Sequence, residues 1–126
     1  MIDHVSVPVR DLAGAGAFYE CVLAPLGLSR LVVRDATIGF GKSYPEFWIN
    51  LRDWAPQTSN PGAHICLRAP SEEAVRAFHA AALAHGGRDE GEPGPRQGAF
   101  TTYFGAFILD PDGNKLEAVT FPKREP

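Results

Sequence analysis

Two histidines and one glutamate are the residues of this chain whose types and spacing could bind a metal. His4 and His64 stand 60 residues apart, and each begins a short run that alternates in polarity. Imidazole is the commonest neutral metal ligand, and Glu117 is the carboxylate that could complete the set. Glu117 stands between apolar neighbours, where a carboxylate is costly to bury unless it is paired or bound to a cation. The alternatives are solvated imidazoles and an exposed glutamate beside Lys115.

The two histidines belong to an internal repeat. A shift of 60 residues superposes a histidine, an aromatic residue and a glycine, namely His4, Phe18 and Gly27 on His64, Phe78 and Gly87. A repeat of this length indicates that one supersecondary unit occurs twice. Two equivalent histidines on equivalent strands could then lie beside one cavity, either within one chain or between two chains.

Each copy is predicted to have the order β-α-β-β-β. Residues 2–9 alternate as a half-buried strand does, and a helix is expected from Leu12 to about Leu26, with Asp11 as N-cap and Gly27 at its end. In the second copy the strand begins at His64, and Ser71 begins a helix that closes at 86–87. The remaining strands are predicted at 29–34, 36–41, 47–53, weakly near 88, 101–109 and 115–121.

Glycine and proline mark the boundaries of these elements. Asp110-Pro111-Asp112-Gly113-Asn114 is a strong turn signal between the last two strands. The segment 91–98 is rich in both residues and is expected to be a loop that acts as a lid or recognises substrate. Comparison of the two last hairpins places Asn50 at the position of Glu117.

Length and composition restrict the class of protein. The chain has 126 residues, 12 basic and 15 acidic side chains, so its net charge is 12 − 15 = −3, and this favours one modest domain without a nucleic-acid surface. No apolar run approaches the roughly 18 residues of a membrane span. Two cysteines are too few for a disulfide framework, which favours the reducing cytoplasm. Neither nucleic acid nor membrane is an expected partner.

The sequence resembles the vicinal oxygen chelate superfamily, which includes glyoxalase I, fosfomycin-resistance transferases, bleomycin-binding proteins and extradiol dioxygenases. The resemblance covers nearly the whole chain and rests on three motifs: His4 to Leu12 followed by Phe18-Tyr19, His64 to Leu67, and Phe107 to Glu117. It implies an α+β fold of two βαβββ modules that form a curled mixed sheet around a central cavity. Within residues 1–126 as one domain, we expect module one at about 1–55, a linker at 56–62 and module two at about 63–122.

The resemblance also implies a site. Its ligands would be His4, His64 and Glu117 on one divalent ion (Zn, Mn, Ni or Fe), with Glu117 also serving as the catalytic base. The expected activity is that of a small glyoxalase-like lyase, isomerase or transferase, acting on a small substrate chelated through vicinal oxygens, in a homodimer. Two alternatives are a metal-free or metal-assisted binding protein that sequesters an antibiotic and an Fe(II) extradiol-type dioxygenase.

Four further residues are candidates for substrate binding. Trp48 shares a strand face with Asn50, the position where glyoxalase I carries a fourth ligand. Tyr103 precedes the Asp110 turn, and Arg96 could hold an anionic group as a bidentate donor. Ordinary packing of the aromatic residues and a solvated Arg96 are the competing interpretations.

Overall fold

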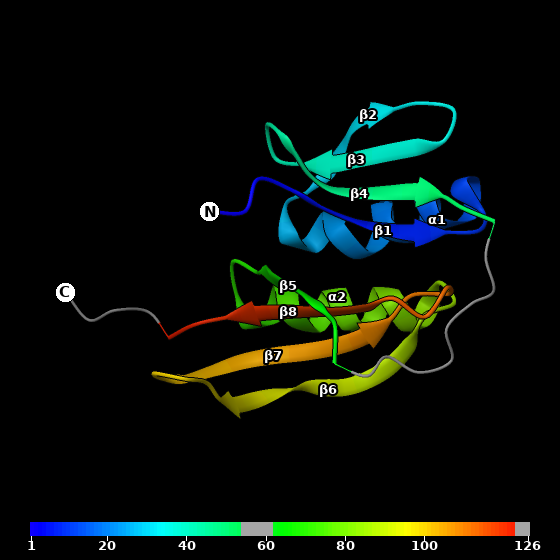
Figure 1. The fold of residues 1–126 in the computed structure, drawn as a ribbon. Coiled ribbons are helices and arrows are strands. Elements are labelled where there is room, and N and C mark those ends of the chain that lie inside the picture. The colour runs from blue at the N-terminus through cyan, green and yellow to red at the C-terminus, as the bar shows by residue number, and fades with distance from the viewer. Residues whose placement is uncertain (54–61, 123–126) are drawn as a thin grey trace.

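The computed structural model describes residues 1–53 and 62–122, which form two modules of the same construction (Figure 1). The elements of module one are β1 Val5–Val9, α1 Leu12–Leu23, β2 Ser29–Val33, β3 Thr37–Gly41 and β4 Pro45–Leu51, with a 3-10 helix at Ala24–Leu26. Those of module two are β5 Ile65–Arg68, α2 Glu72–Ala84, β6 Arg88–Gln97, β7 Thr102–Leu109 and β8 Lys115–Thr120. The predicted α+β fold of two βαβββ modules is confirmed.

Each module has its own four-stranded mixed sheet. The strand orders are β1-β4-β3-β2 and β5-β8-β7-β6, so the first strand of each module lies at an edge of its sheet. The pairs β1·β4 and β5·β8 are parallel, and the other pairs are antiparallel. The two modules therefore share one topology, as the shift of 60 residues predicts.

Local sequence accounts for where the helices begin and end. The Asp11 carboxylate accepts a hydrogen bond from the Gly14 N–H at 3.1 Å, and the Ser71 hydroxyl accepts one from the Ala74 N–H at 3.1 Å. Both satisfy backbone donors that a helix leaves unpaired at its N-terminus. Gly27 has a φ of +84°, a conformation that glycine adopts without a Cβ penalty. The predicted N-cap Asp11, the predicted start of a helix at Ser71 and the predicted stop at Gly27 are confirmed.

The core fills the space between each sheet and its helix. Alternation along β1 sends Val7 and Val9 into the core, and α1 contributes Phe18 and Tyr19, all four at most 8% exposed. Full burial of a side chain of this size contributes roughly 1.5–3 kcal/mol. The opposite face of each sheet is left free to carry polar residues, and the candidate site lies there.

The segment 91–98 is a strand and not the loop that its composition predicts. Residues 88–97 form β6, which pairs with β7 and has register shifts between Asp89 and Gly91 and between Gly91 and Gly94. β6 is an edge strand, so prolines at 93 and 95 can lack an N–H without breaking a ladder on both sides. The expectation of a lid at this segment is therefore wrong.

The turn after β7 ties the two modules together. The buried Asp110 carboxylate accepts a hydrogen bond from the Tyr19 hydroxyl of α1 at 2.5 Å, and Asn114 Nδ2 donates to the Pro8 carbonyl oxygen at 2.9 Å. The helices α1 and α2 also pack against each other. Within the chain, the modules thus meet through their helices and this turn.

The connection between the modules lies largely outside the described residues. Only Gly62 of the linker predicted at 56–62 is described, so the linker and the exact module boundaries stay predictions. In the described part of the chain, no helix combines the length and the apolar character needed to cross a membrane.

Candidate metal and substrate site

Module two presents a buried carboxylate with two side-chain partners. Glu117 on β8 is 4% exposed and pairs in register with Cys66 on β5. His64 Nε2 lies 3.2 Å from Glu117 Oε1, and the Tyr103 hydroxyl donates to Glu117 Oε2 at 2.9 Å. The structure thus brings together three residues that the sequence singled out, namely His64, Tyr103 and Glu117.

The neighbours of Glu117 are kept protonated. Partial burial and the Glu117 carboxylate raise the pKa of the Cys66 thiol to about 12, because both disfavour the thiolate. Burial and the same carboxylate also raise the pKa of Tyr103. At neutral pH both groups are neutral hydrogen-bond donors, so Cys66 is not a reactive thiolate here.

Module one carries His4 beside a separate hollow of about 230 Å³, which we call the module-one hollow. Its lining residues are His4, Ser6, Arg34, Thr37, Trp48 and Asn50. His4 Nδ1 lies 2.7 Å from Asp3 Oδ1, and the Tyr44 hydroxyl donates to the same carboxylate at 3.0 Å. A proton on Nδ1 would leave Nε2 with a free lone pair, the tautomer that a metal ligand requires.

The strand register changes the expected equivalence between the modules. Ser6 pairs with Trp48 on β4, just as Cys66 pairs with Glu117 on β8. Trp48, and not Asn50, is therefore the counterpart of Glu117, and the hairpin comparison was wrong by two residues. The β3–β4 pairing also has an irregularity of one residue between Phe40 and Gly41, which loop length alone does not reveal.

Trp48 and Asn50 are both held by residues of the β2–β3 hairpin. A Cβ at Gly39 would lie 2.9 Å from two atoms of the Trp48 ring, so glycine allows the indole to lie against β3. The Arg34 guanidinium lies 5.8 Å from the centroid of that ring. The Thr37 hydroxyl donates to Asn50 Oδ1 at 2.6 Å. The module-one hollow thus combines an aromatic wall with fixed polar groups.

Arg96 has a structural environment. Its guanidinium donates to the backbone carbonyl oxygens of Glu92, Gly94 and Gly105 at 2.7–2.9 Å and lies 5.5 Å from the centroid of the Phe107 ring. These bonds fix the irregular part of β6 against β7. A substrate contact by Arg96 stays a prediction, and it would compete with these bonds.

Sequence reasoning missed Asp3, Arg34 and Thr37. Asp3 is adjacent to His4, and an acidic neighbour of a candidate ligand is a signal that could have been used. Strand alternation places Thr37 on the same face of β3 as Gly39, away from the buried Ile38. Arg34 lies just beyond β2, and only the three-dimensional hairpin brings it to Trp48.

The side chains of His4, His64 and Glu117 are of the types that bind a divalent cation. Within one chain, however, the three side chains do not lie together. Two atoms bound to a cation at about 2.1 Å and at about 90–109° lie about 3.0–3.4 Å apart. The 3.2 Å between His64 Nε2 and Glu117 Oε1 is of this size. In residues 1–53 and 62–122, no three His, Cys, Asp or Glu side chains converge on one point. His4 belongs to the module-one hollow, and Glu117 and Tyr103 border another of about 440 Å³ on module two.

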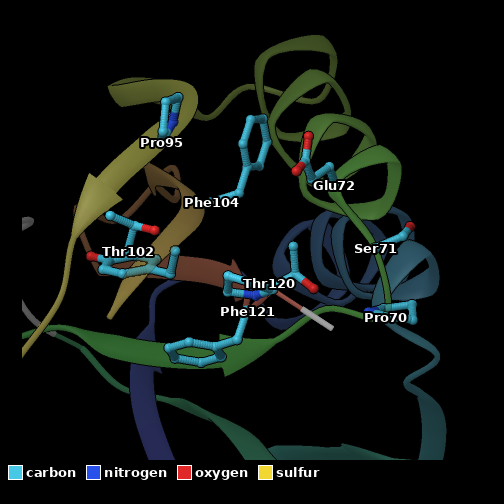
Figure 2. Close-up of a pocket in the computed structure, with 10 residues that line it drawn as sticks. Pro70, Ser71, Glu72, Pro95, Thr102, Phe104, Thr120 and Phe121 are labelled. Carbon is cyan, nitrogen blue, oxygen red and sulfur yellow. The ribbon is translucent and has the colours of Figure 1, made fainter. Parts of the chain in front are cut away.

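Another hollow of about 400 Å³ lies between α2 and the sheet of module two (Figure 2). Ser71 and Glu72 border it from the start of α2, and Phe104 and Thr120 border it from β7 and β8. Phe104 and Thr120 lie on the sheet face opposite to Glu117, because side chains alternate along a strand. His64 and Glu117 do not line this hollow, although it shares Tyr103 and Phe121 with the hollow beside Glu117.

Comparisons with known proteins agree with this architecture. The family model described as Glyoxalase/Bleomycin resistance protein/Dioxygenase superfamily matches residues 1–118. The chain belongs to this superfamily. Among the curated proteins that were compared, none matches significantly.

Solved structures of glyoxalase-superfamily proteins share the fold. A glyoxalase/bleomycin resistance protein from Albidiferax ferrireducens T118 is 36% identical, with a TM-score of 0.81, over 93% of this chain and 96% of that one. Glyoxalase I from Zea mays is 23% identical, with a TM-score of 0.72, over 93% of this chain but only 44% of that one. At this lower identity the likeness to the Zea mays protein shows the fold alone.

Proposed function

We propose that this chain is a small divalent-metal-dependent enzyme of the glyoxalase type, a lyase, isomerase or transferase. The observation that carries the proposal is the buried Glu117 carboxylate beside the His64 imidazole, at 3.2 Å. A buried carboxylate next to a nitrogen ligand is a costly arrangement that a bound cation would stabilise. The description of the family to which the chain belongs supports the same class.

The complete site forms between two copies of the chain. Within one chain the modules meet through their helices, while β1 and β5 remain sheet edges that carry His4 and His64 at their starts. Edge strands present unpaired backbone groups and favour pairing with another chain. With β1 of one copy beside β5 of its partner, His4 faces His64 and Glu117 across a two-fold axis.

Each residue then has a defined task. A divalent cation in this position would stabilise negative charge that develops on two neighbouring substrate oxygens. His4, oriented by Asp3, offers Nε2 as a ligand, and His64 and Glu117 supply the others. Tyr103 holds Glu117 Oε2 and so fixes the carboxylate that takes a proton from the substrate.

The experiment is a metal analysis of protein purified without chelators. The wild type should contain stoichiometric divalent ion, and at a hundredfold excess of metal over Kd the binding adds about 2.7 kcal/mol, or several degrees of Tm. His4→Ala and Glu117→Gln should each abolish both effects. His85→Ala removes an exposed imidazole at the C-cap of α2 and should change neither.

Absence of metal from the wild type, together with no rise in Tm when Mn, Fe, Ni or Zn is added, would exclude the proposal. It would leave the metal-free sequestering protein as the interpretation. Ligand affinity that survives His4→Ala and Glu117→Gln would point the same way.

A further inference from the structure

The module-one hollow is built from hydrogen-bond donors. Every side chain of its lining carries an N–H or O–H group, and no carboxylate is among them. Trp48 occupies the position in module one that Glu117 occupies in module two. The surface around Glu117 therefore contains an anionic residue at this position, and the module-one hollow contains a neutral indole. Arg34 is the lining residue with a permanent charge and attracts anions, while the nearby Asp3 carboxylate is engaged with His4 at 2.7 Å.

The Arg34 guanidinium is positioned to bind an anion in the module-one hollow. Its backbone N–H donates to the Thr37 carbonyl oxygen at 2.9 Å, which fixes the residue in the β2–β3 hairpin, and its guanidinium packs on Trp48. Among residues 1–53 and 62–122, no hydrogen bond or ion pair engages that guanidinium, in contrast to those of Arg30 and Arg96. Its planar fork is therefore free to bind an anion with two parallel hydrogen bonds.

The amide of Asn50 has a defined orientation. Its Oδ1 accepts the Thr37 hydroxyl proton at 2.6 Å, a shorter contact than the 3.0 Å from that hydroxyl to the Ile49 carbonyl oxygen. The group that Asn50 offers to the hollow is then Nδ2, which can only donate. Asn50 in this orientation suits an anion and does not suit a cation.

We propose that the module-one hollow binds a carboxylate of the substrate, with the Arg34 guanidinium and Asn50 Nδ2 as donors. A planar carboxylate can continue the guanidinium plane over the Trp48 indole, which a tetrahedral phosphate cannot do. The inference rests on the proposed function, because the metal would hold the vicinal oxygens of the same molecule. The substrate class is then an acid with a vicinal oxygen pair and a separate carboxylate.

The test uses two probes of one shape, 3,4-dihydroxybenzoate and its neutral amide 3,4-dihydroxybenzamide, which share the vicinal oxygens. Calorimetric titration of zinc-loaded protein under nitrogen should show the carboxylate binding about tenfold more tightly, as a charge-assisted hydrogen bond predicts. Arg34→Gln should remove this preference by weakening the binding of the carboxylate much more than that of the amide. Arg88→Gln, the same change of charge at an exposed residue of β6, should retain it.

A second variant adds a negative charge to the module-one hollow. Asn50→Asp replaces a donor by a carboxylate and should make the amide the better ligand. Equal affinities of the wild type for the two probes, or a preference that survives Arg34→Gln, would overturn the inference even if zinc is bound. The wild type could take up no zinc and still prefer the carboxylate probe, with Arg34→Gln removing that preference. This result would support the carboxylate site while the metal proposal fails.

Discussion

Two histidine–carboxylate pairs in this protein differ in which partner is buried. In the pair of His64 and Glu117 the carboxylate is buried and the imidazole is about one third exposed, facing the open side of the sheet. In the pair of His79 and Asp89 the imidazole is buried and the carboxylate is exposed, and the 2.8 Å contact joins α2 to β6. The first arrangement suits binding, whereas the second holds a helix to a strand.

The Asp89 pair gives a prediction about acid stability. The hydrogen bond with His79, aided by the Gly91 N–H, lowers the pKa of Asp89 from its ordinary value of 3.8. The unfolded chain therefore binds more protons, so this stabilisation is complete above about pH 3.8 and is lost as the pH falls through the lower folded pKa. In urea titrations from pH 5 to pH 3, Asp89→Asn should lose less stability than the wild type.

Glu90→Gln is the control, because it removes a neighbouring exposed carboxylate. It should retain the slope of the wild type. A slope in Asp89→Asn as steep as that of the wild type would show that this contact does not contribute.

At the scale of elements, the turn between β7 and β8 has a structural task. Asp110 accepts hydrogen bonds from the Tyr19 hydroxyl and from the Asn114 and Asp112 backbone N–H groups. Burial raises the pKa of Asp110, and burial together with Asp110 raises that of Tyr19. The Asp110 turn of the motif Phe107 to Glu117 thus joins the modules, while the same motif ends at Glu117, a candidate metal ligand.

Removal of the Tyr19 hydroxyl should weaken the contact between the modules and so lower the free energy of unfolding. Tyr19→Phe leaves one bond fewer on a buried carboxylate, which should cost about 1–3 kcal/mol of the free energy of unfolding. Urea denaturation measures the change. Tyr44→Phe deletes the same atom from an exposed ring and should have little effect on stability. Equal losses in the two variants would contradict the assigned role of the turn.

The sequence predicted most elements because their signals are local. Asp11 and Ser71 cap their helices through side-chain bonds three residues away, and alternation identifies the buried face of β1. The strand β6 was missed because composition does not show that a proline-rich segment lies at a sheet edge. The pairing of Ser6 with Trp48 was missed because the register between two strands is a long-range property that the lengths of two hairpins do not reveal.

The structure brings several of the predicted site residues together, and their roles in binding metal or substrate stay predictions. His64, Tyr103 and Glu117 do meet, and His4, Trp48 and Asn50 share one hollow. Whether the residues of module one meet those of module two within one chain or between two chains depends on how the modules pack. The sequence carries no local signal for this long-range packing. The same limit applies to Arg34, which a hairpin brings to Trp48.

At the scale of the whole molecule, the two half-sites lie on different sheets of one chain. The helices α1 and α2 and the Asp110 turn make the contact between the modules, and β1 and β5 are edge strands of their sheets (Figure 1). Two copies related by a two-fold axis would form two identical sites, each with ligands from both chains. We propose that the metal site is shared between two chains in this way.

Mixing two inactive variants tests this claim most directly. His4→Ala and Glu117→Gln homodimers each lack a ligand in both sites, but a mixed dimer has one site with all its ligands. Refolding of an equal mixture should therefore restore bound zinc to about a quarter of the wild-type content, since about half of the dimers are mixed. Zinc content that stays at the level of the unmixed variants would contradict a site shared between chains.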